Sequence, residues 1–185
     1  MKSQPALILV DIQKGFEIED YFGGNRNNPE AEENAKALLT LWREHKLPIF
    51  HVKHNSIFSD SPLRQGQPGN EFHEKVKPLA GEPVIGKSVN SAFIGTDLED
   101  WLDRLKITKL VIAGLTTDHC ISTTTRMAGN FGFDTFLVSD ATATFNKKGI
   151  DGEDYSAELI HATALASLNN EFATIVTTGF LKKNI

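Results

Sequence analysis

The chain has 185 residues, of which 40% are hydrophobic, and carries a formal net charge of −5. This length and apolar content suffice for one well-buried core and predict a single domain over 1–185. The negative charge excludes a general attraction to nucleic acid or to an anionic membrane. Every apolar run is also shorter than a membrane span. We therefore expect a small molecule as the partner.

Cys120 is the only cysteine of the chain. Without a second cysteine there is no internal disulfide, which is typical of a protein in a reducing compartment. The first residues run directly into a short apolar stretch and lack the long apolar core of a secretory leader. The sequence therefore predicts a cytoplasmic location.

Apolar runs of strand length alternate with amphipathic segments of helix length. In chain order we expect a strand at 6–10, a helix at 29–46, strands at 48–52 and 84–85, a helix that opens with capping-box spacing at 96–99, a strand at 109–113, a helix at 120–131, a strand at 133–138, a helix at 155–169 and a strand at 173–177. This alternation predicts a three-layer, doubly wound α/β fold with a mostly parallel six-stranded sheet in the order 3-2-1-4-5-6. The ligand crevice of that fold lies at the carboxyl ends of strands one and four.

Three side chains that could take part in catalysis follow predicted strands. Asp11 follows the first strand, Lys87 the third and Cys120 the turn after the fourth. Each also has a plain interpretation: a carboxylate that bonds backbone amides, a solvated lysine and a buried structural cysteine. Together they place an acid, a cation and a thiol at one crevice, where a helix start would favour the thiolate. This convergence predicts an activated nucleophile.

The segments 7–13 (LILVDIQ), 87–93 (KSVNSAF) and 114–120 (GLTTDHC) carry a family resemblance. Over essentially its whole length the chain resembles the isochorismatase-like cysteine hydrolases, which include nicotinamidases and N-carbamoylsarcosine amidase. The resemblance implies that Asp11 is the general base, Lys87 the supporting cation and Cys120 the nucleophile. It also implies the isochorismatase-like fold and a homo-oligomer, either a dimer or a tetramer.

The same resemblance implies a cis peptide bond between Leu115 and Thr116. It assigns the oxyanion hole to the backbone N–H groups of Thr116 and Cys120. The expected reaction is hydrolysis of a small amide, carbamoyl or related C–N bond through a thioester-type intermediate. These steps need no organic cofactor.

Two departures from named relatives narrow this expectation. Nicotinamidases hold a metal through an Asp-x-His element, which is missing from the segment 50–55 (FHVKHN). His51 and His54 would point to opposite faces of a strand, so we expect no bound metal. True isochorismatases, which cleave a vinyl ether, lack the nucleophilic cysteine. Cys120 therefore favours C–N hydrolysis, with ether hydrolysis as an alternative.

Polar and aromatic residues near the strand ends are candidates for substrate binding. For each of them, simple packing or hydrogen bonding within a loop is the competing interpretation. The candidates are Gln13, Phe16, His54, Asn90, Phe93 and His119. The segment 55–70 reads as an ordered loop beside the site, in which Arg64 is a conceivable anchor for a carboxylate.

Two further functions compete with hydrolysis of a C–N bond. The segment His119 to Arg126 matches the His-Cys-x5-Arg spacing of cysteine phosphatases, but its interval contains no glycine to wrap backbone N–H groups around a phosphate. Alternatively, Cys120 is a redox-sensing thiol, or the chain is a binding protein on an enzyme fold. The absence of a resolving cysteine weakens a disulfide switch.

Overall fold

The computed structural model describes residues 4–185, and the middle of its sheet is the apolar strand β1 (Ala6–Val10). Every residue of β1 is buried. Successive side chains of a strand point to opposite faces. Ile8 and Val10 accordingly enter one core cluster, whereas Leu7 and Leu9 enter another. A strand that is apolar on both faces needs helices on each side of its sheet.

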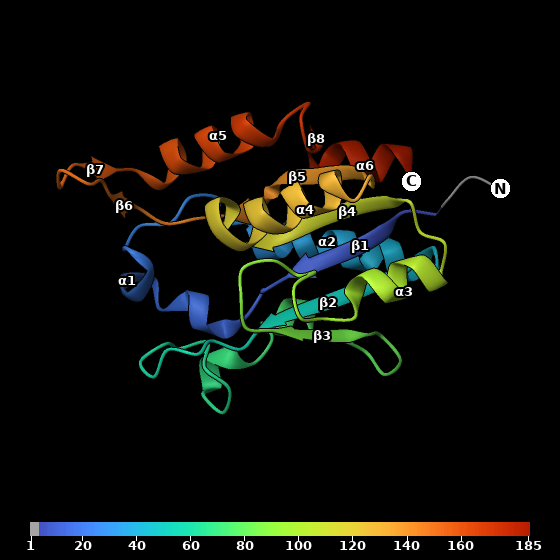
Figure 1. Cartoon of the computed structure of the whole chain (residues 1–185), viewed down its shortest axis with the longest axis horizontal. Helices are drawn as coiled ribbons and strands as arrows, with labels where there is room; N and C mark the ends of the chain where they lie inside the picture. Colours follow the sequence, from blue (N-terminus) through green and yellow to red (C-terminus); the bar gives the residue numbers. More distant parts are fainter. Residues whose placement is uncertain (1–3) are drawn as a thin grey trace.

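The main sheet confirms the predicted topology. Its strands are β1, β2 (Ile49–His54), β3 (Val84–Lys87), β4 (Lys109–Leu115), β5 (Asp134–Ala143) and β8 (Thr174–Val176). Their order is β3-β2-β1-β4-β5-β8, and each neighbouring pair is parallel (Figure 1). The carboxyl ends of β1 and β4 therefore lie side by side, as the predicted crevice requires.

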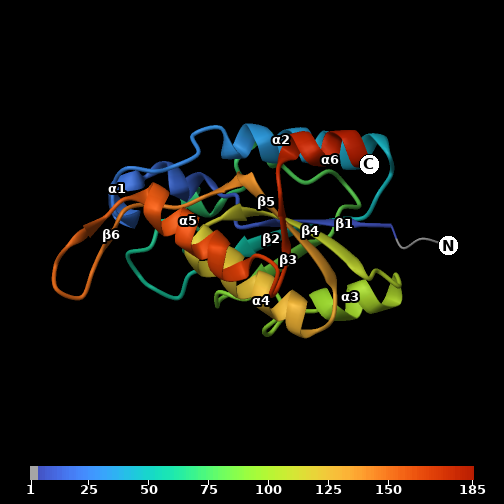
Figure 2. The same cartoon turned by 90° about the horizontal axis from the view of Figure 1, so that it is seen from above.

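Helices cover both faces of this sheet (Figure 2). The α-helices within residues 4–185 are α1 (Glu19–Phe22), α2 (Ala31–Glu44), α3 (Leu98–Arg104), α4 (Ser122–Asn130), α5 (Ala157–Leu168) and α6 (Thr178–Asn184). Helices α2 and α6 lie over one face, and α3, α4 and α5 lie over the other. Helix α2 packs through apolar residues at helical spacing, among them Leu38, Leu39 and Trp42.

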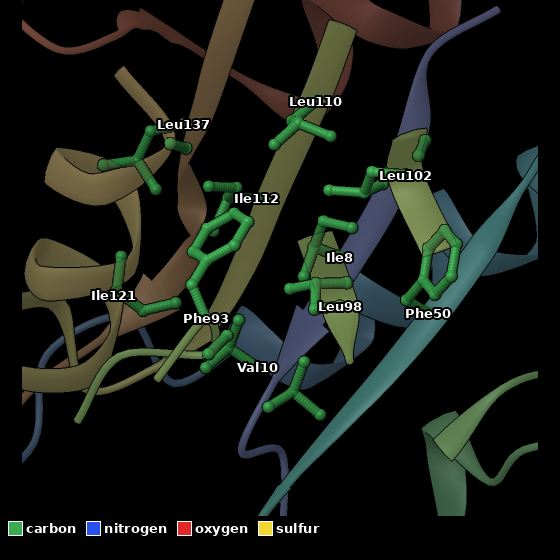
Figure 3. Packing of buried hydrophobic residues seen from close by; sticks show 14 of the residues in the cluster. Ile8, Val10, Phe50, Phe93, Leu98, Leu102, Leu110, Ile112, Ile121 and Leu137 are labelled. Atoms are coloured by element: carbon green, nitrogen blue, oxygen red, sulfur yellow. The ribbon is translucent and has the colours of Figure 1, made fainter. Parts of the chain in front are cut away.

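The core beneath α3 and α4 adjoins the crevice (Figure 3). Leu98 and Leu102 of α3 pack toward Ile8 of the central strand, and Ile121 enters the same cluster at the start of α4. Each of these four side chains is at most 1% exposed. A close-packed interior holds the backbone at the strand ends in fixed positions, which is what a catalytic site needs.

Several predicted boundaries were wrong in detail. β2 continues to His54, β4 to Leu115 and β5 to Ala143, because each strand end remains paired or buried beyond its most apolar part. The predicted capping box does not form. The Thr96 hydroxyl donates to the Ala92 carbonyl (2.6 Å), and the residue before α3, Asp97, makes no capping bond.

Some elements were missed. The helix predicted at 120–131 corresponds to α4, and the π-helical turn that precedes it, Thr117–Ile121, was not predicted. Helices α1 and α6 and the hairpin of β6 (Lys147–Lys148) and β7 (Asp154–Tyr155) had no predicted counterpart. The hairpin projects beyond the sheet next to α5 (Figure 1).

Within residues 4–185, none of the helices has the length and apolar content needed to cross a lipid bilayer. The expectation for the N-terminus falls partly on residues 1–3, which lie outside the described part of the chain.

A charged cluster beside β3 gives a pH-dependent prediction. Glu82 accepts hydrogen bonds from Arg43 (2.7 and 2.8 Å), from the Leu79 N–H (2.8 Å) and from His51 (2.8 Å). Burial alone would raise the pKa of Glu82, but these bonds outweigh it and lower the pKa to about 2. The carboxylate therefore stabilises the fold above its ordinary pKa of 4.5, and this contribution is lost as the pH falls through about 2.

We expect Glu82→Gln to lower the melting temperature at neutral pH. The difference between the variant and the wild type should shrink as the pH falls from 4.5 toward 2, because the wild-type carboxyl then becomes protonated. Circular dichroism melting curves across this range measure that difference. A difference that stays constant with pH would contradict the assigned role of Glu82.

Candidate active site

Asp11 is placed by the end of β1. Its backbone φ is 55°, so the chain leaves the strand in the left-handed region, which aspartate tolerates better than most residues. The residue is completely buried. A buried carboxylate requires a charged partner or several hydrogen bonds, so its neighbours decide what it can do.

Gly114 brings the thiol loop, residues 114–120, up to the end of β1. It pairs with Val10 across β1 and β4, and its φ is 135°. A side chain at this position would place Cβ 1.9 Å from the Val10 carbonyl oxygen, so glycine is required for the close approach. The Leu115–Thr116 peptide bond that follows is cis, and the π-helical turn after it carries Cys120. The turn therefore starts directly beside Asp11.

Lys87 reaches the same point from β3. Its Nζ atom lies 2.5 Å from Asp11 Oδ2, 3.3 Å from Cys120 Sγ and 3.1 Å from the carbonyl oxygen of Val89. The cross-strand neighbour of Lys87 on β2 is His54, whose Nδ1 atom lies 3.0 Å from the same Nζ. The structure thus brings together the acid, the cation and the thiol whose convergence the sequence predicted.

The thiol environment differs from the expectation in one respect. Burial raises the pKa of Cys120, and the Asp11 carboxylate raises it further, whereas Lys87 opposes both effects. The helix start was expected to favour a thiolate, whereas burial and the Asp11 carboxylate shift the pKa of Cys120 in the opposite direction.

The two carboxylate oxygens of Asp11 have different surroundings. Oδ2 forms the ion pair with Lys87, both side chains being fully buried. Oδ1 is buried and has no hydrogen-bond partner within residues 4–185. A buried oxygen without a partner is costly, and at a strand end beside a thiol it is an acceptor that is free to receive a proton.

A cavity of about 290 Å³ opens onto this cluster. Of the predicted substrate-binding residues, Phe16, His54, Asn90 and His119 line it. Its other lining residues are Asp11, Tyr21, Phe22, Phe58, Ser61, Leu63, Thr116, Cys120 and Lys147. The cavity volume admits only a small molecule.

Two predicted substrate-binding residues have other roles. Gln13 is buried, and its side-chain amide clamps the backbone: Nε2 donates to the His54 (3.1 Å) and Asn70 (2.9 Å) carbonyls, and Oε1 accepts from the His54 N–H (2.8 Å). Phe93 packs in the core against Phe131 and Phe133. Each side chain is engaged by contacts within the protein, and neither lines the cavity.

Two arginines considered from the sequence lie away from the thiol. Arg64 is exposed and does not line the cavity, although its loop contributes Ser61 and Leu63. Arg126 on α4 stacks over the Phe172 ring, 4.8 Å from its centroid, and donates to Ser122. The arginine that a phosphatase would need for phosphate is therefore engaged elsewhere, which disfavours that alternative.

Sequence reasoning missed Lys147 and the support of the thiol loop. Lys147 reaches the cavity from the hairpin, whose existence no local pattern indicated. The Thr117 hydroxyl lies 2.9 Å from His161 Nδ1, and Asp118 accepts a 2.5 Å hydrogen bond from Thr144. These contacts support the loop, and His161 contacts Thr117 without lining the cavity.

The histidines of β2 have separate partners. His51 is buried and bonded to Glu82, whereas His54 belongs to the cavity. One oxygen of Asp11, one nitrogen of His54 and the sulfur of Cys120 lie within 4.8 Å of one another and are the atoms here that could hold a metal ion.

Comparisons with known proteins agree with this architecture. The Isochorismatase domain model matches residues 5–179. The isochorismatase-family protein YrdC of Bacillus subtilis is 49% identical over 98% of this chain and 96% of its own length. A crystal structure of an isochorismatase-family protein from Chromobacterium violaceum superposes with a TM-score of 0.94 at 39% identity, covering 100% of this chain and 97% of that one.

A more distant relative has a named activity. Maleamate amidohydrolase of Pseudomonas putida is 26% identical over 94% of this chain and 83% of its own length. The fold and these matches define a hydrolase that acts on a small molecule. More particularly, the chain belongs to the isochorismatase family.

Proposed function

We propose that this protein is a cysteine hydrolase that cleaves the C–N bond of a small amide or carbamoyl compound through an acyl-enzyme on Cys120. The observation that carries the proposal is the buried cluster at the strand ends. Lys87 Nζ bridges Asp11 Oδ2 and Cys120 Sγ, while Asp11 Oδ1 has no hydrogen-bond partner among residues 4–185. This arrangement supplies a nucleophile, a base and a positive charge beside both of them.

The first half-reaction uses each of these groups. Asp11 accepts the thiol proton as Cys120 Sγ attacks the carbonyl carbon, so the thiol, whose pKa burial raises, need not ionise before the substrate binds. The oxyanion is held by the backbone N–H groups of Thr116 and Cys120. Collapse breaks the C–N bond, and Asp11 returns its proton to the departing nitrogen. The products are ammonia or an amine and a thioester.

The second half-reaction reverses these roles. Asp11 accepts a proton from water as the water oxygen attacks the thioester carbonyl. The C–S bond breaks, the acid is released and the thiol regains its proton. Lys87 stays within reach of both Asp11 and the sulfur throughout, so its positive charge stabilises whichever of the two is anionic. The chain's own residues account for every proton transfer.

The cavity supports a small substrate with an apolar body. One part of its wall is apolar and consists of Phe16, Phe22, Phe58 and Leu63. Polar atoms near the thiol come from His54 and Asn90. Cys120 Sγ lies 3.8 Å from Asn90 Oδ1. The maleamate amidohydrolase relative, named for action on an amide, agrees with this class of substrate.

Intact-mass spectrometry on a panel of small amides, carbamoyl compounds and one enol ether tests the proposal. We expect the compounds that release ammonia to leave, after an acid quench, an adduct with the mass of the acyl group on Cys120. Ammonia release that persists after Cys120 has been alkylated would contradict the covalent mechanism. Turnover of the enol ether alone would favour the ether-hydrolase alternative.

We also propose that the chain forms one domain over 1–185, works in the cytoplasm and assembles as a homodimer or homotetramer. Exposed apolar side chains support the assembly: Ile150 in the hairpin turn is 99% exposed, and Leu159 on α5 is 49% exposed. Analytical ultracentrifugation should return a multiple of the 20.4 kDa chain mass. A monomer mass at micromolar concentration would contradict the assembly.

A further inference from the structure

The ammonium group of Lys87 occupies an unusual position. Its Nζ atom is surrounded by four acceptors: Asp11 Oδ2, His54 Nδ1, the Val89 carbonyl oxygen and Cys120 Sγ, at distances between 2.5 and 3.3 Å. An ammonium donates hydrogen bonds and accepts none. His54 must therefore present the lone pair of Nδ1 to Lys87 and carry its own proton on Nε2. Lone pairs of oxygen, nitrogen and sulfur thus converge on one positive charge.

The three side chains around this charge are also ligands for zinc. A carboxylate oxygen, an imidazole nitrogen and a cysteine sulfur are the donors that Zn²⁺ prefers. Their atoms already lie within 4.8 Å of one another. Bonds of about 2.0–2.3 Å to a tetrahedral ion would place them roughly 3.3–3.8 Å apart. Small side-chain movements therefore suffice to bring the three ligand atoms to the spacing of a tetrahedral site.

A second observation points to a missing ligand at this place. Asp11 Oδ1 is fully buried and has no hydrogen-bond partner within the described chain. When an ion displaces Lys87, this carboxylate has a free oxygen with which to bind it. The Lys87 side chain is itself completely buried, so a divalent ion and the ammonium cannot share the cluster without strong repulsion.

We propose that Asp11, His54 and Cys120 form an inhibitory site for a thiophilic divalent cation such as Zn²⁺, and that Lys87 is the resident cation with which the metal competes. On binding, the S–H bond of Cys120 breaks, a metal–sulfur bond forms and the proton passes to solvent. No electron is transferred. Inhibition rests on the proposed role of Cys120 as nucleophile, whereas metal binding itself does not.

The charge of Lys87 determines the expected affinities. In the wild type the metal has to displace a buried ammonium, so its binding is weak. Lys87→Met keeps much of the side-chain bulk and removes the charge, which leaves the three ligands without a cation. Lysine at this position therefore supports the thiol and also keeps metals away from it.

Titration with Co²⁺ provides a readout that does not depend on activity. We expect Lys87→Met to bind one Co²⁺ with a near-ultraviolet thiolate-to-cobalt charge-transfer band and a Kd at least tenfold below that of the wild type. Adding Cys120→Ser should remove the band, and adding His54→Phe should raise the Kd at least tenfold. Lys147→Met, which removes a lysine of the same cavity outside the cluster, is the matched control and should leave the wild-type Kd unchanged.

Equal Co²⁺ affinity in the wild type and in folded Lys87→Met would overturn the proposal, as would a band that survives His54→Phe with unchanged affinity. If Lys87→Met does not fold, alkylation of Cys120 in the wild-type protein tests the metal site instead. ZnCl₂ should protect Cys120 from alkylation, EDTA should reverse the protection, and absence of protection would refute the site. If the protein binds Co²⁺ in this way but no amide acylates Cys120, the result supports the metal site and contradicts the proposed function.

Discussion

Cys120→Ser is expected to lower kcat for amide hydrolysis by at least about 10⁴-fold. Serine keeps the shape of the side chain but replaces the thiol with a hydroxyl, which gives up its proton far less readily. Nothing else near the cavity replaces the sulfur, since Cys120 is the only cysteine of the chain. The melting temperature should stay within a few degrees of the wild-type value, because a buried atom is exchanged for one of similar size.

The measurement is ammonia release under substrate saturation, paired with the intact mass of the quenched enzyme. Arg126→Ala is the matched control, since Arg126 lies over the Phe172 ring on α4 and its loss should change kcat by less than about threefold. Equal losses in the two variants would favour the Cys-x5-Arg chemistry of phosphatases. Full turnover by Cys120→Ser would contradict the covalent mechanism.

Asp11→Asn is expected to change two quantities in opposite directions. Hydrolysis should fall by about 10²- to 10⁴-fold in kcat, because the base that accepts the thiol proton is gone. The pKa of Cys120 should fall as well, since the Asp11 carboxylate raises it and the opposing Lys87 remains in place. The variant thiol should therefore react faster with iodoacetamide at pH 7–8 while the enzyme hydrolyses its substrate more slowly.

The rate of alkylation as a function of pH gives the thiol pKa directly. Lys87→Met supplies the comparison, since loss of the ammonium should raise this pKa and slow alkylation. Both substitutions break a buried ion pair and should cost about 3–5 kcal/mol of stability, so melting curves must accompany the rates. If Asp11→Asn slows alkylation and hydrolysis alike, Asp11 does not act on the thiol as described.

The strand order was predictable from the sequence because a strand buried on both faces appears as a continuous apolar run. β1 is apolar at every position, and the runs that pair with it are separated by segments of helix length. Strand ends then fixed the neighbourhood of Asp11, Lys87 and Cys120 without any knowledge of side-chain directions. The hairpin that carries Lys147 contains no such run, because each of its strands has only two residues.

Side-chain direction determines which of the predicted residues line the cavity. Gln13 follows Asp11 closely in sequence, but its amide satisfies backbone groups of His54 and Asn70 and so is unavailable to a ligand. The direction of the Cys120 pKa shift differs from the expectation for a helix start for a related reason. The partial charge of a helix start acts over a short range, whereas burial and a neighbouring carboxylate depend on tertiary packing.

The strand order also determines when in folding the chain can become active. Asp11 and Lys87 are 76 residues apart, and they meet only because β2 pairs with both β1 and β3. Parallel pairings between distant segments close large loops and form slowly. An assay of hydrolysis during refolding would thus record the docking of β3. Tryptophan fluorescence of a Trp101→Phe variant would record the core, because Trp42, the other tryptophan, is a buried residue of α2. A lag between the two signals would measure how late the edge strand arrives.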